Sequence, residues 1–195
     1  MIEVEVKIPL HSRDNTENEL IRLGFASGDL IRETDIYFTS DFHDFLKRDE
    51  ALRIRRSENL TKATASAVLT FKGPKIDAVS MTRKEVETRI EDPAGMQVIL
   101  LALGFREVIP VRKLRKYYNM DIEGYSDYGD VSWTVHACLD QVEGLGSFLE
   151  LEMLVEREED CQDALDRVEW ILHELGYGLA DTTRDSYLCM LMGLE

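Results

Sequence analysis

The sequence predicts an α+β fold in which eight antiparallel strands close into a barrel and helices pack on its outside. The first observation is an unbroken alternation of apolar and charged residues at the N-terminus. The apolar side chains of this strand are Ile2, Val4, Val6 and Ile8, and the charged ones on its other face are Glu3, Glu5 and Lys7. The second observation is that later segments repeat this pattern between short turns, which favours antiparallel pairing.

The third observation concerns the helices, which need an apolar platform to bury their own apolar sides. The only such platform on these strands is the face opposite the charges. A charged strand face is usually solvated, and a solvated sheet remains the alternative interpretation. If helices cover the apolar face instead, the charges point into the lumen of the barrel. We therefore expect a charged interior.

Seven further strands are predicted after the first. They lie near Ile31–Thr39, Ala51–Arg56, Ala65–Lys72, Thr82–Glu91, Val108–Ile122, Val131–Asp140 and Phe148–Val155. The polar segments Asp41–Glu50 and Ser57–Thr64 are predicted to be exposed loops. No linker composition divides the chain, so residues 1–195 are interpreted as a single domain.

Capping residues predict the helices between and after these strands. The expected helices run from Ser12 or Asp14 to Gly24, from Asp92 and Pro93 to Gly104, and from Asp163 to Glu174. Serine and aspartate are favoured at the position just before a helix, and proline is favoured at the first position of the helix. Glycine is the preferred residue just past the end of a helix, because it adopts positive φ without strain.

The composition limits partners and location. A formal net charge of −15 repels nucleic acids and anionic membrane surfaces, so we expect neither as a partner. No apolar run is long enough to cross a membrane, and the N-terminus lacks the features of a signal peptide, which predicts a cytoplasmic protein. Cys138, Cys161 and Cys189 are too widely separated for a zinc site and are expected to be buried thiols.

The lumen of the predicted barrel would contain charges of both signs. The inward carboxylates are Glu3, Glu5, Glu85, Glu87, Asp140, Glu150 and Glu152, and the inward bases are Lys7, Arg53, Arg55, Lys72, Lys113 and Arg115. Neither set alone could be tolerated inside a protein. The mixture suits a polyphosphate that is held by arginine and lysine and bridged to carboxylates by Mg²⁺ or Mn²⁺.

Several motifs in a fixed order resemble the CYTH family of triphosphate tunnel enzymes over nearly the whole chain. The motifs are Glu3-x-Glu5-x-Lys7, Thr34-Asp35-x-Tyr37-Phe38, Leu52-Arg53-Ile54-Arg55, Leu69-Thr70-Phe71-Lys72-Gly73-Pro74, Lys113-x-Arg115-x-Tyr117, Asp140 before Gly144-Leu145-Gly146, Phe148-x-Glu150-x-Glu152 and Ser186-Tyr187. The resemblance implies an eight-stranded antiparallel barrel whose tunnel holds a triphosphate. One departure is Glu33, where the family pattern leads us to expect glutamine, and it could alter the tunnel mouth.

The resemblance also implies a role for each inward residue. The residues implied to bind divalent metal, Mg²⁺ or Mn²⁺, are Glu3, Glu5, Glu150 and Glu152, helped by Asp140. Those implied to bind phosphate oxygens are Lys7, Arg53, Arg55, Lys72, Lys113 and Arg115. Lys72 and Tyr37 are catalytic candidates that could orient a water molecule. Glu85, which with Glu87 matches the acidic pair in the middle of the family pattern, is the third catalytic candidate.

Three functions follow from the resemblance. The first choice is a class IV adenylyl cyclase, which converts ATP to cyclic AMP and pyrophosphate. The alternative is a triphosphatase that hydrolyses tripolyphosphate, thiamine triphosphate or a nucleoside triphosphate. The third is a module that binds a polyphosphate or nucleotide without catalysis. Resemblance to the cyclase branch also implies a homodimer.

His136 shares a strand face with Cys138 and Asp140, and its role stays open. A histidine that is simply packed in a strand is the preferred interpretation. The alternative is that its side chain contacts a nucleobase in the lumen.

Overall fold

The computed structural model of the chain describes residues 2–126 and 129–194, so Met1 of the predicted first strand and Glu195 lie outside the described residues. The main strands are β1 (Ile2–Pro9), β2 (Ala26–Thr39), β3 (Ala51–Asn59), β4 (Thr64–Lys75), β5 (Arg83–Arg89), β7 (Val111–Ser126), β8 (Gly129–Val142) and β9 (Gly146–Val155). They pair in the order β3-β4-β5-β1-β9-β8-β7-β2, and a further antiparallel pairing of β2 with β3 closes the sheet. The predicted eight-stranded antiparallel barrel is therefore confirmed.

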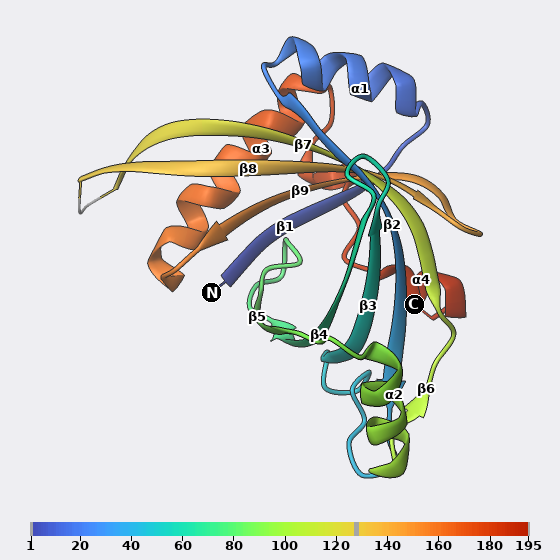
Figure 1. Cartoon of the computed structure of the whole chain (residues 1–195). Helices are drawn as coiled ribbons and strands as arrows, with labels where there is room; N and C mark the ends of the chain where they lie inside the picture. The colour runs from blue at the N-terminus through green and yellow to red at the C-terminus, as the bar shows by residue number, and fades with distance from the viewer. Residues whose placement is uncertain (1, 127–128, 195) are drawn as a thin grey trace.

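The helices lie outside the barrel (Figure 1). They are α1 (Arg13–Arg22), α2 (Pro93–Ala102), α3 (Cys161–Glu174) and α4 (Tyr187–Met192), with short 3-10 turns at Glu158–Asp160 and Leu179–Asp181. The apolar face of β1 is buried against α1 and α3, in a cluster that includes Val4, Leu20 and Val168. The charged face of β1 is left for the lumen, as the sequence predicts.

The expected starts of α1 and α2 are confirmed, whereas α3 begins at Cys161 rather than at the predicted Asp163. Asp92 caps α2, because its side chain accepts hydrogen bonds from the backbone N–H groups of Ala94 and Gly95. Ser12 occupies the capping position of α1, but its side chain makes no capping hydrogen bond. Gly24, just past α1, has a φ of +99°, which explains the glycine there.

The structure corrects three expectations about elements. The predicted loop Ser57–Thr64 is wrong at both ends, because β3 continues to Asn59 and β4 begins at Thr64. The Asn59 side chain accepts hydrogen bonds from the backbone of Thr61 and Lys62 and so forms the tight turn. β2 begins at Ala26 rather than Ile31, ahead of an irregularity in its pairing with β7. Strand β6 (Arg106–Glu107) and helix α4 were not predicted, since both are too short for a periodic signal.

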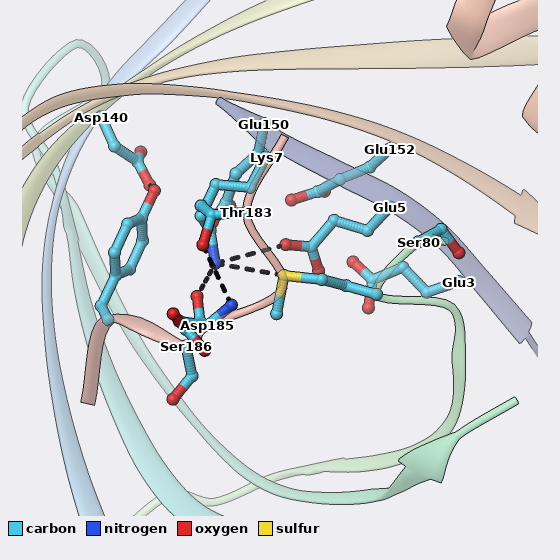
Figure 2. A network of polar contacts seen from close by, with 12 residues as sticks. Glu3, Glu5, Lys7, Ser80, Asp140, Glu150, Glu152, Thr183, Asp185 and Ser186 are labelled. Carbon is cyan, nitrogen blue, oxygen red and sulfur yellow. Dashed lines mark hydrogen bonds and ion pairs between the residues drawn. The ribbon is translucent and has the colours of Figure 1, made fainter. Parts of the chain in front are cut away.

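The segment before α4 crosses the barrel close to the end of β1. The backbone N–H of Thr183 donates to the carbonyl of Lys7 at 2.8 Å. The Arg184 guanidinium donates to the carbonyls of Ser80 and Asp77, at 3.1 and 2.7 Å. Figure 2 shows Thr183, Asp185 and Ser186 beside the Lys7 side chain. This C-terminal segment, residues 183–186, is thus part of the tunnel wall.

No helix in the described ranges is both long and apolar enough to cross a membrane. All three cysteines are free thiols, as predicted, but the expectation that all three are buried is confirmed for Cys138 alone among them. Cys138 is buried in the barrel wall, and Cys161 and Cys189 are half-buried.

Candidate functional site

A cavity of about 600 Å³ runs through the lumen of the barrel. Its lining includes nearly every predicted site residue: Glu3, Glu5, Lys7, Tyr37, Arg53, Arg55, Lys72, Glu85, Lys113, Arg115, Glu150 and Glu152. The volume lies within the range of small-molecule sites, about 300–1,000 Å³. The charged strand faces therefore line one ligand-sized space, and the solvated-sheet alternative is wrong.

Asp140 differs from the other predicted residues, because its carboxylate lies in the wall and is fully buried. It accepts hydrogen bonds from Lys113 Nζ at 2.9 Å and from Arg115 Nε at 2.7 Å. The Tyr187 hydroxyl donates to the same carboxylate at 3.0 Å. Burial alone would raise the pKa of Asp140, but Arg115 and Lys113 lower it. In this structure Asp140 holds the two cations in place, shares Arg115 with Glu150, and lies outside the group formed by Glu3, Glu5 and Glu152.

Glu150 is held between two cations. Its carboxylate lies 3.2 Å from Lys7 Nζ and forms a close ion pair with Arg115. Burial opposes ionisation, yet Arg115, Lys7 and Lys113 keep the pKa of Glu150 well below its usual value. The carboxylate is therefore ionised and already neutralised by protein groups.

Glu3, Glu5 and Glu152 form a separate carboxylate group, in which one oxygen from each residue lies within 4.8 Å of the others. Glu5 and Glu152 are direct partners in the β1–β9 register, which brings them together. Figure 2 shows the three side chains projecting from these strands toward the same space.

Each carboxylate of this group has one cation near it, since Lys72 lies 3.5 Å from Glu3, Lys7 lies 3.7 Å from Glu5 and Arg115 lies 3.2 Å from Glu152. Burial and mutual repulsion still disfavour ionisation of Glu5 and Glu152. Burial raises the pKa of Glu152 well above its usual value, and Glu3, Glu150 and Glu5 add to the rise against Arg115. Burial and Glu150 also raise the pKa of Glu5. Oxygen donors at this spacing are the ligand type that Mg²⁺ and Mn²⁺ prefer. These residues fit a divalent metal, which would relieve their mutual repulsion.

Lys72 joins Glu3 to Glu85 beside this group. Its ammonium is 3.5 Å from Glu3 Oε2 and forms a close ion pair with Glu85. Burial would raise the pKa of Glu3, but Lys72 and a hydrogen bond with Glu85 lower it to about 2. Burial and the hydrogen bond to Glu3 raise the pKa of Glu85 to about 8, against the effect of Lys72. Of these two carboxyl groups, Glu85 is therefore the one that retains a proton to higher pH.

Tyr37, the other catalytic candidate, is 9% exposed and lines the same cavity as Lys72. In the described part of the chain, no hydrogen bond joins the two side chains. Tyr37 lies on β2, opposite Arg53 of β3. Lys72 lies on β4, opposite Ala51 of β3. Their joint orientation of a water molecule stays a prediction.

Two buried acidic residues of the barrel wall were missing from the predicted lumen set. Asp35 binds the Arg55 guanidinium through two hydrogen bonds of 2.7 Å and lies 3.4 Å from Arg53. Glu33 lies 3.3 Å from Arg55 and 3.4 Å from Lys113. Both are only 2% exposed, so Glu33 is part of the inner wall. The spacing of Glu33, Asp35 and Tyr37, which puts both acids on one strand face with the predicted site residue Tyr37, was the sequence signal that could have placed them.

Three basic residues at the cavity were also missed. They are Lys75, Arg83 and Arg184. Lys75 forms a close ion pair with Asp49, and Arg83 is 3.9 Å from the same carboxylate. Arg184 reaches the cavity from the C-terminal segment, and no strand pattern could have revealed it.

His136 also lines the cavity. Its Nδ1 lies 2.7 Å from Asn119 Oδ1, and burial lowers the pKa of the imidazole. Tyr117 and Leu154 line the same cavity on the neighbouring strands. The alternative in which His136 faces the lumen is thus the one that the structure supports.

Comparison with known proteins identifies the family. The family model of the CYTH domain matches residues 1–187. The chain belongs to the CYTH family. A Methanocaldococcus jannaschii protein whose name assigns it provisionally as an adenylate cyclase is 37% identical over 96% of this chain and 97% of its own length.

Solved structures of similar proteins share this CYTH fold. A Pyrococcus horikoshii protein is 37% identical, with a TM-score of 0.81 and coverage of 98% of both chains. A Hippeastrum protein, described as an adenylyl cyclase candidate that reveals a dominant triphosphatase activity, is 18% identical, with a TM-score of 0.63 over 100% of this chain and 96% of its own. At that identity the Hippeastrum structure supports the fold alone.

Proposed function

We propose that this CYTH protein is a divalent-metal-dependent enzyme that acts on a triphosphate bound in the tunnel. The proposal rests on one observation: the carboxylates of Glu3, Glu5 and Glu152 lie together beside a buried set of cations. A site that only binds polyphosphate needs the cations but has no use for a separate group of crowded carboxylates. The non-catalytic binding module is therefore the weakest of the three candidates.

Glu3, Glu5 and Glu152 would hold Mg²⁺ or Mn²⁺, which neutralises phosphate charge and helps to activate the attacking oxygen. Asp140 and Glu150, which the family pattern adds to the ligand set, lie with protein cations and are proposed to position those cations. Phosphate oxygens would bind the six predicted bases. They are Lys7, Arg53, Arg55, Lys72, Lys113 and Arg115.

The proposed reaction is the conversion of ATP to cyclic AMP and pyrophosphate. The ribose 3′-oxygen forms a bond to the α-phosphorus, the bond from that phosphorus to the bridging oxygen breaks, and pyrophosphate leaves with the hydroxyl proton released. Glu85, with a pKa of about 8, can carry and release a proton near neutral pH and is proposed to serve in proton transfer. The name of the 37% identical Methanocaldococcus relative supports this choice.

Triphosphate hydrolysis is the second candidate. It requires water, rather than the ribose hydroxyl, to attack the terminal phosphorus, and the same cations would serve. Lys72 and Tyr37 both line the cavity and are the proposed residues for orienting that water. This alternative rests on the resemblance to the family, which implies triphosphatases as well as cyclases.

One experiment separates the candidates. The protein is incubated with ATP, tripolyphosphate and thiamine triphosphate under Mg²⁺ and Mn²⁺, and the products are identified by chromatography. Cyclic AMP and pyrophosphate from ATP would support the cyclase. Orthophosphate from tripolyphosphate without cyclic AMP from ATP would establish the triphosphatase instead, and tight binding without any product would favour the binding module.

We also propose that the protein works in the cytoplasm and forms a homodimer, with neither nucleic acid nor membrane as a partner. The negative net charge of −15 supports the exclusion of both polyanionic partners. The homodimer rests on resemblance to the cyclase branch of the family. A monomer mass by light scattering at micromolar concentration would contradict it.

A further inference from the structure

Helix α2 and the loop beside it carry large apolar side chains that are exposed on the outside of the barrel. Val98, Ile99, Leu101, Leu103 and Phe42 are each between 44% and 67% exposed. These five residues make up the α2 surface. Single exposed apolar residues are common on proteins, whereas a cluster of them marks a site of interaction.

The inner side of α2 is already buried against the barrel. Leu100 lies in a buried cluster with Phe38 and Ile54, and Met96 packs against the same cluster. An ordinary surface helix presents polar side chains on its outer side, whereas a helix that is apolar all round is buried all round. In Figure 1, α2 lies at the end of the barrel away from α1 and α3, so neither of these helices covers its outer side.

Phe42 widens the α2 surface from a separate segment. It lies in the loop between β2 and β3, and its ring packs edge to face on the ring of Phe105, with 5.3 Å between the centroids. Phe105 follows α2 directly after Gly104. The α2 surface is therefore wider than one helix.

The α2 surface carries no charge. Between Pro93 and Phe105 the sequence has no charged residue, although the chain has a net charge of −15. The one polar side chain of this range is Gln97, which accepts a hydrogen bond from Arg56 at 2.8 Å and donates one to Glu107 at 2.6 Å. These polar groups at its edge are thus paired within the subunit.

Next to Phe42 and Phe105 in the sequence lie two further charges, Asp41 and Arg106. They bind each other through two hydrogen bonds of 2.7 Å. An apolar centre with a polar, internally paired edge is the composition of a protein interface.

This composition indicates which partner covers the α2 surface. Helices that bind lipid surfaces carry lysine and arginine along a polar side, and α2 has neither residue type. A protein of opposite charge would meet the acidic parts of the surface instead. Two copies that each carry a charge of −15 repel, so they can pack closely only where neither presents a charge. Homodimer interfaces are also more apolar than other interfaces.

We propose that the α2 surface is the interface between two copies of this chain. A twofold axis places the same surface on both sides, so that α2 of one copy packs against α2 of the other. The inference rests on the homodimer of the proposed function, to which it assigns a surface, and it does not depend on the reaction in the tunnel.

Analytical ultracentrifugation of the full chain measures the dissociation constant of the dimer. Val98→Glu places a charge in both halves of the interface and is expected to weaken the dimer about a hundredfold or more. Val98→Gln adds no charge and is expected to weaken it about tenfold. Ile21→Glu is the control of matched charge, because Ile21 is 54% exposed and lies on α1 at the other end of the barrel. Circular dichroism spectra equal to that of wild type show that the variants are folded.

Salt provides a second readout. Screening reduces the repulsion between two acidic subunits, so the wild-type dimer should become tighter as the ionic strength rises from about 0.05 M to 0.5 M. An interface made of exposed ion pairs would become weaker instead, and that result would overturn the inference.

The other outcomes separate this inference from the homodimer itself. A wild-type dimer that Val98→Glu leaves unchanged, or that Ile21→Glu weakens equally, overturns the α2 interface while the homodimer stands. A wild-type protein that stays monomeric at about 100 μM overturns both, and the products formed from triphosphates then test the reaction separately. Binding of that monomer to phosphatidylcholine vesicles would assign the α2 surface to lipid.

Discussion

Lys7 and Glu150 face each other across β1 and β9, and the Lys7 ammonium lies 3.2 Å from the Glu150 carboxylate. Both residues are at least 95% buried, so this ion pair is held in the lumen rather than in bulk water. The ammonium also lies 4.2 Å from the centre of the Tyr187 ring. Removing two charges from water costs free energy, and the fold retains both. The pair keeps a cation ready for an anionic ligand.

Replacement of Lys7 by glutamine tests this role directly. The variant loses one charge-assisted hydrogen bond to phosphate, which contributes roughly 1.5–3 kcal/mol. We therefore expect Lys7→Gln to weaken tripolyphosphate binding about 10- to 150-fold, measured by calorimetry. Lys47→Gln is the matched control, because the Lys47 side chain is 85% exposed and pairs with Asp44 at the surface. Equal affinities for the two variants would remove Lys7 from the phosphate site.

Asp140→Asn distinguishes a cation-positioning residue from a metal ligand. The substitution leaves Lys113 and Arg115 buried without their shared carboxylate, and breaking a buried ion pair costs about 3–5 kcal/mol. We expect this loss in the free energy of unfolding, measured with urea in the absence of divalent metal. A variant of wild-type stability that binds Mn²⁺ more weakly would instead make Asp140 a metal ligand.

The barrel and its charged lumen could be predicted because strand periodicity is strict where both faces are buried. Glu5 and Lys7 alternate with Val4 and Val6 without interruption, and only one arrangement buries the apolar set under helices. The partition of the lumen charges could not be predicted in the same way. Which carboxylate meets which cation depends on strand register, and the sequence leaves that register open.

Asp140 and Glu152 illustrate this limit. Both are acidic residues on inward strand faces, and the family pattern gives both the same role. The β7–β8 register places Asp140 opposite Arg115, whereas the β1–β9 register places Glu152 opposite Glu5. Asp140 is thereby paired with two cations, whereas Glu152, which Arg115 contacts at 3.2 Å, is also crowded by like charge. The Tyr187 contact to Asp140 was also beyond prediction, since it depends on where the C-terminal segment crosses the barrel.

The buried pair of Asp35 and Arg55 predicts a pH dependence of stability. Burial would raise the pKa of Asp35, but Arg55 and Arg53 hold it well below its usual value. A carboxyl group with a depressed folded-state pKa stabilises the fold at pH values above its unfolded-state pKa, which is about 3.9 for aspartate. This stabilisation is lost as the pH falls from that value toward the folded-state pKa. The difference in the free energy of unfolding between wild type and Asp35→Asn is therefore expected to be at its maximum at pH 6. It should shrink by about 1.4 kcal/mol for each pH unit below pH 3.9.

Urea unfolding of both proteins from pH 6 down to pH 2.5 measures this difference. Asp41→Asn is the control, because the Asp41 carboxylate pairs with Arg106 at the exposed surface, where ion pairs contribute little. A difference between wild type and Asp35→Asn that stays constant over this range would show that Asp35 is not ionised in the folded protein.

Glu152→Gln tests the metal site through stability as well as activity. Without metal, the substitution removes one of three crowded carboxylates, so the free energy of unfolding should be unchanged or higher. With metal, the free energy of unfolding of the wild-type protein rises by RT ln(1 + [metal]/Kd), which is about 2.7 kcal/mol at a hundredfold excess of metal over Kd. We expect Mn²⁺ to raise the melting temperature of wild type and of the exposed control Glu143→Gln, but not that of Glu152→Gln at equal ionic strength. Turnover of the triphosphate should fall in parallel. Equal metal-induced stabilisation of all three proteins would place the metal outside this carboxylate group.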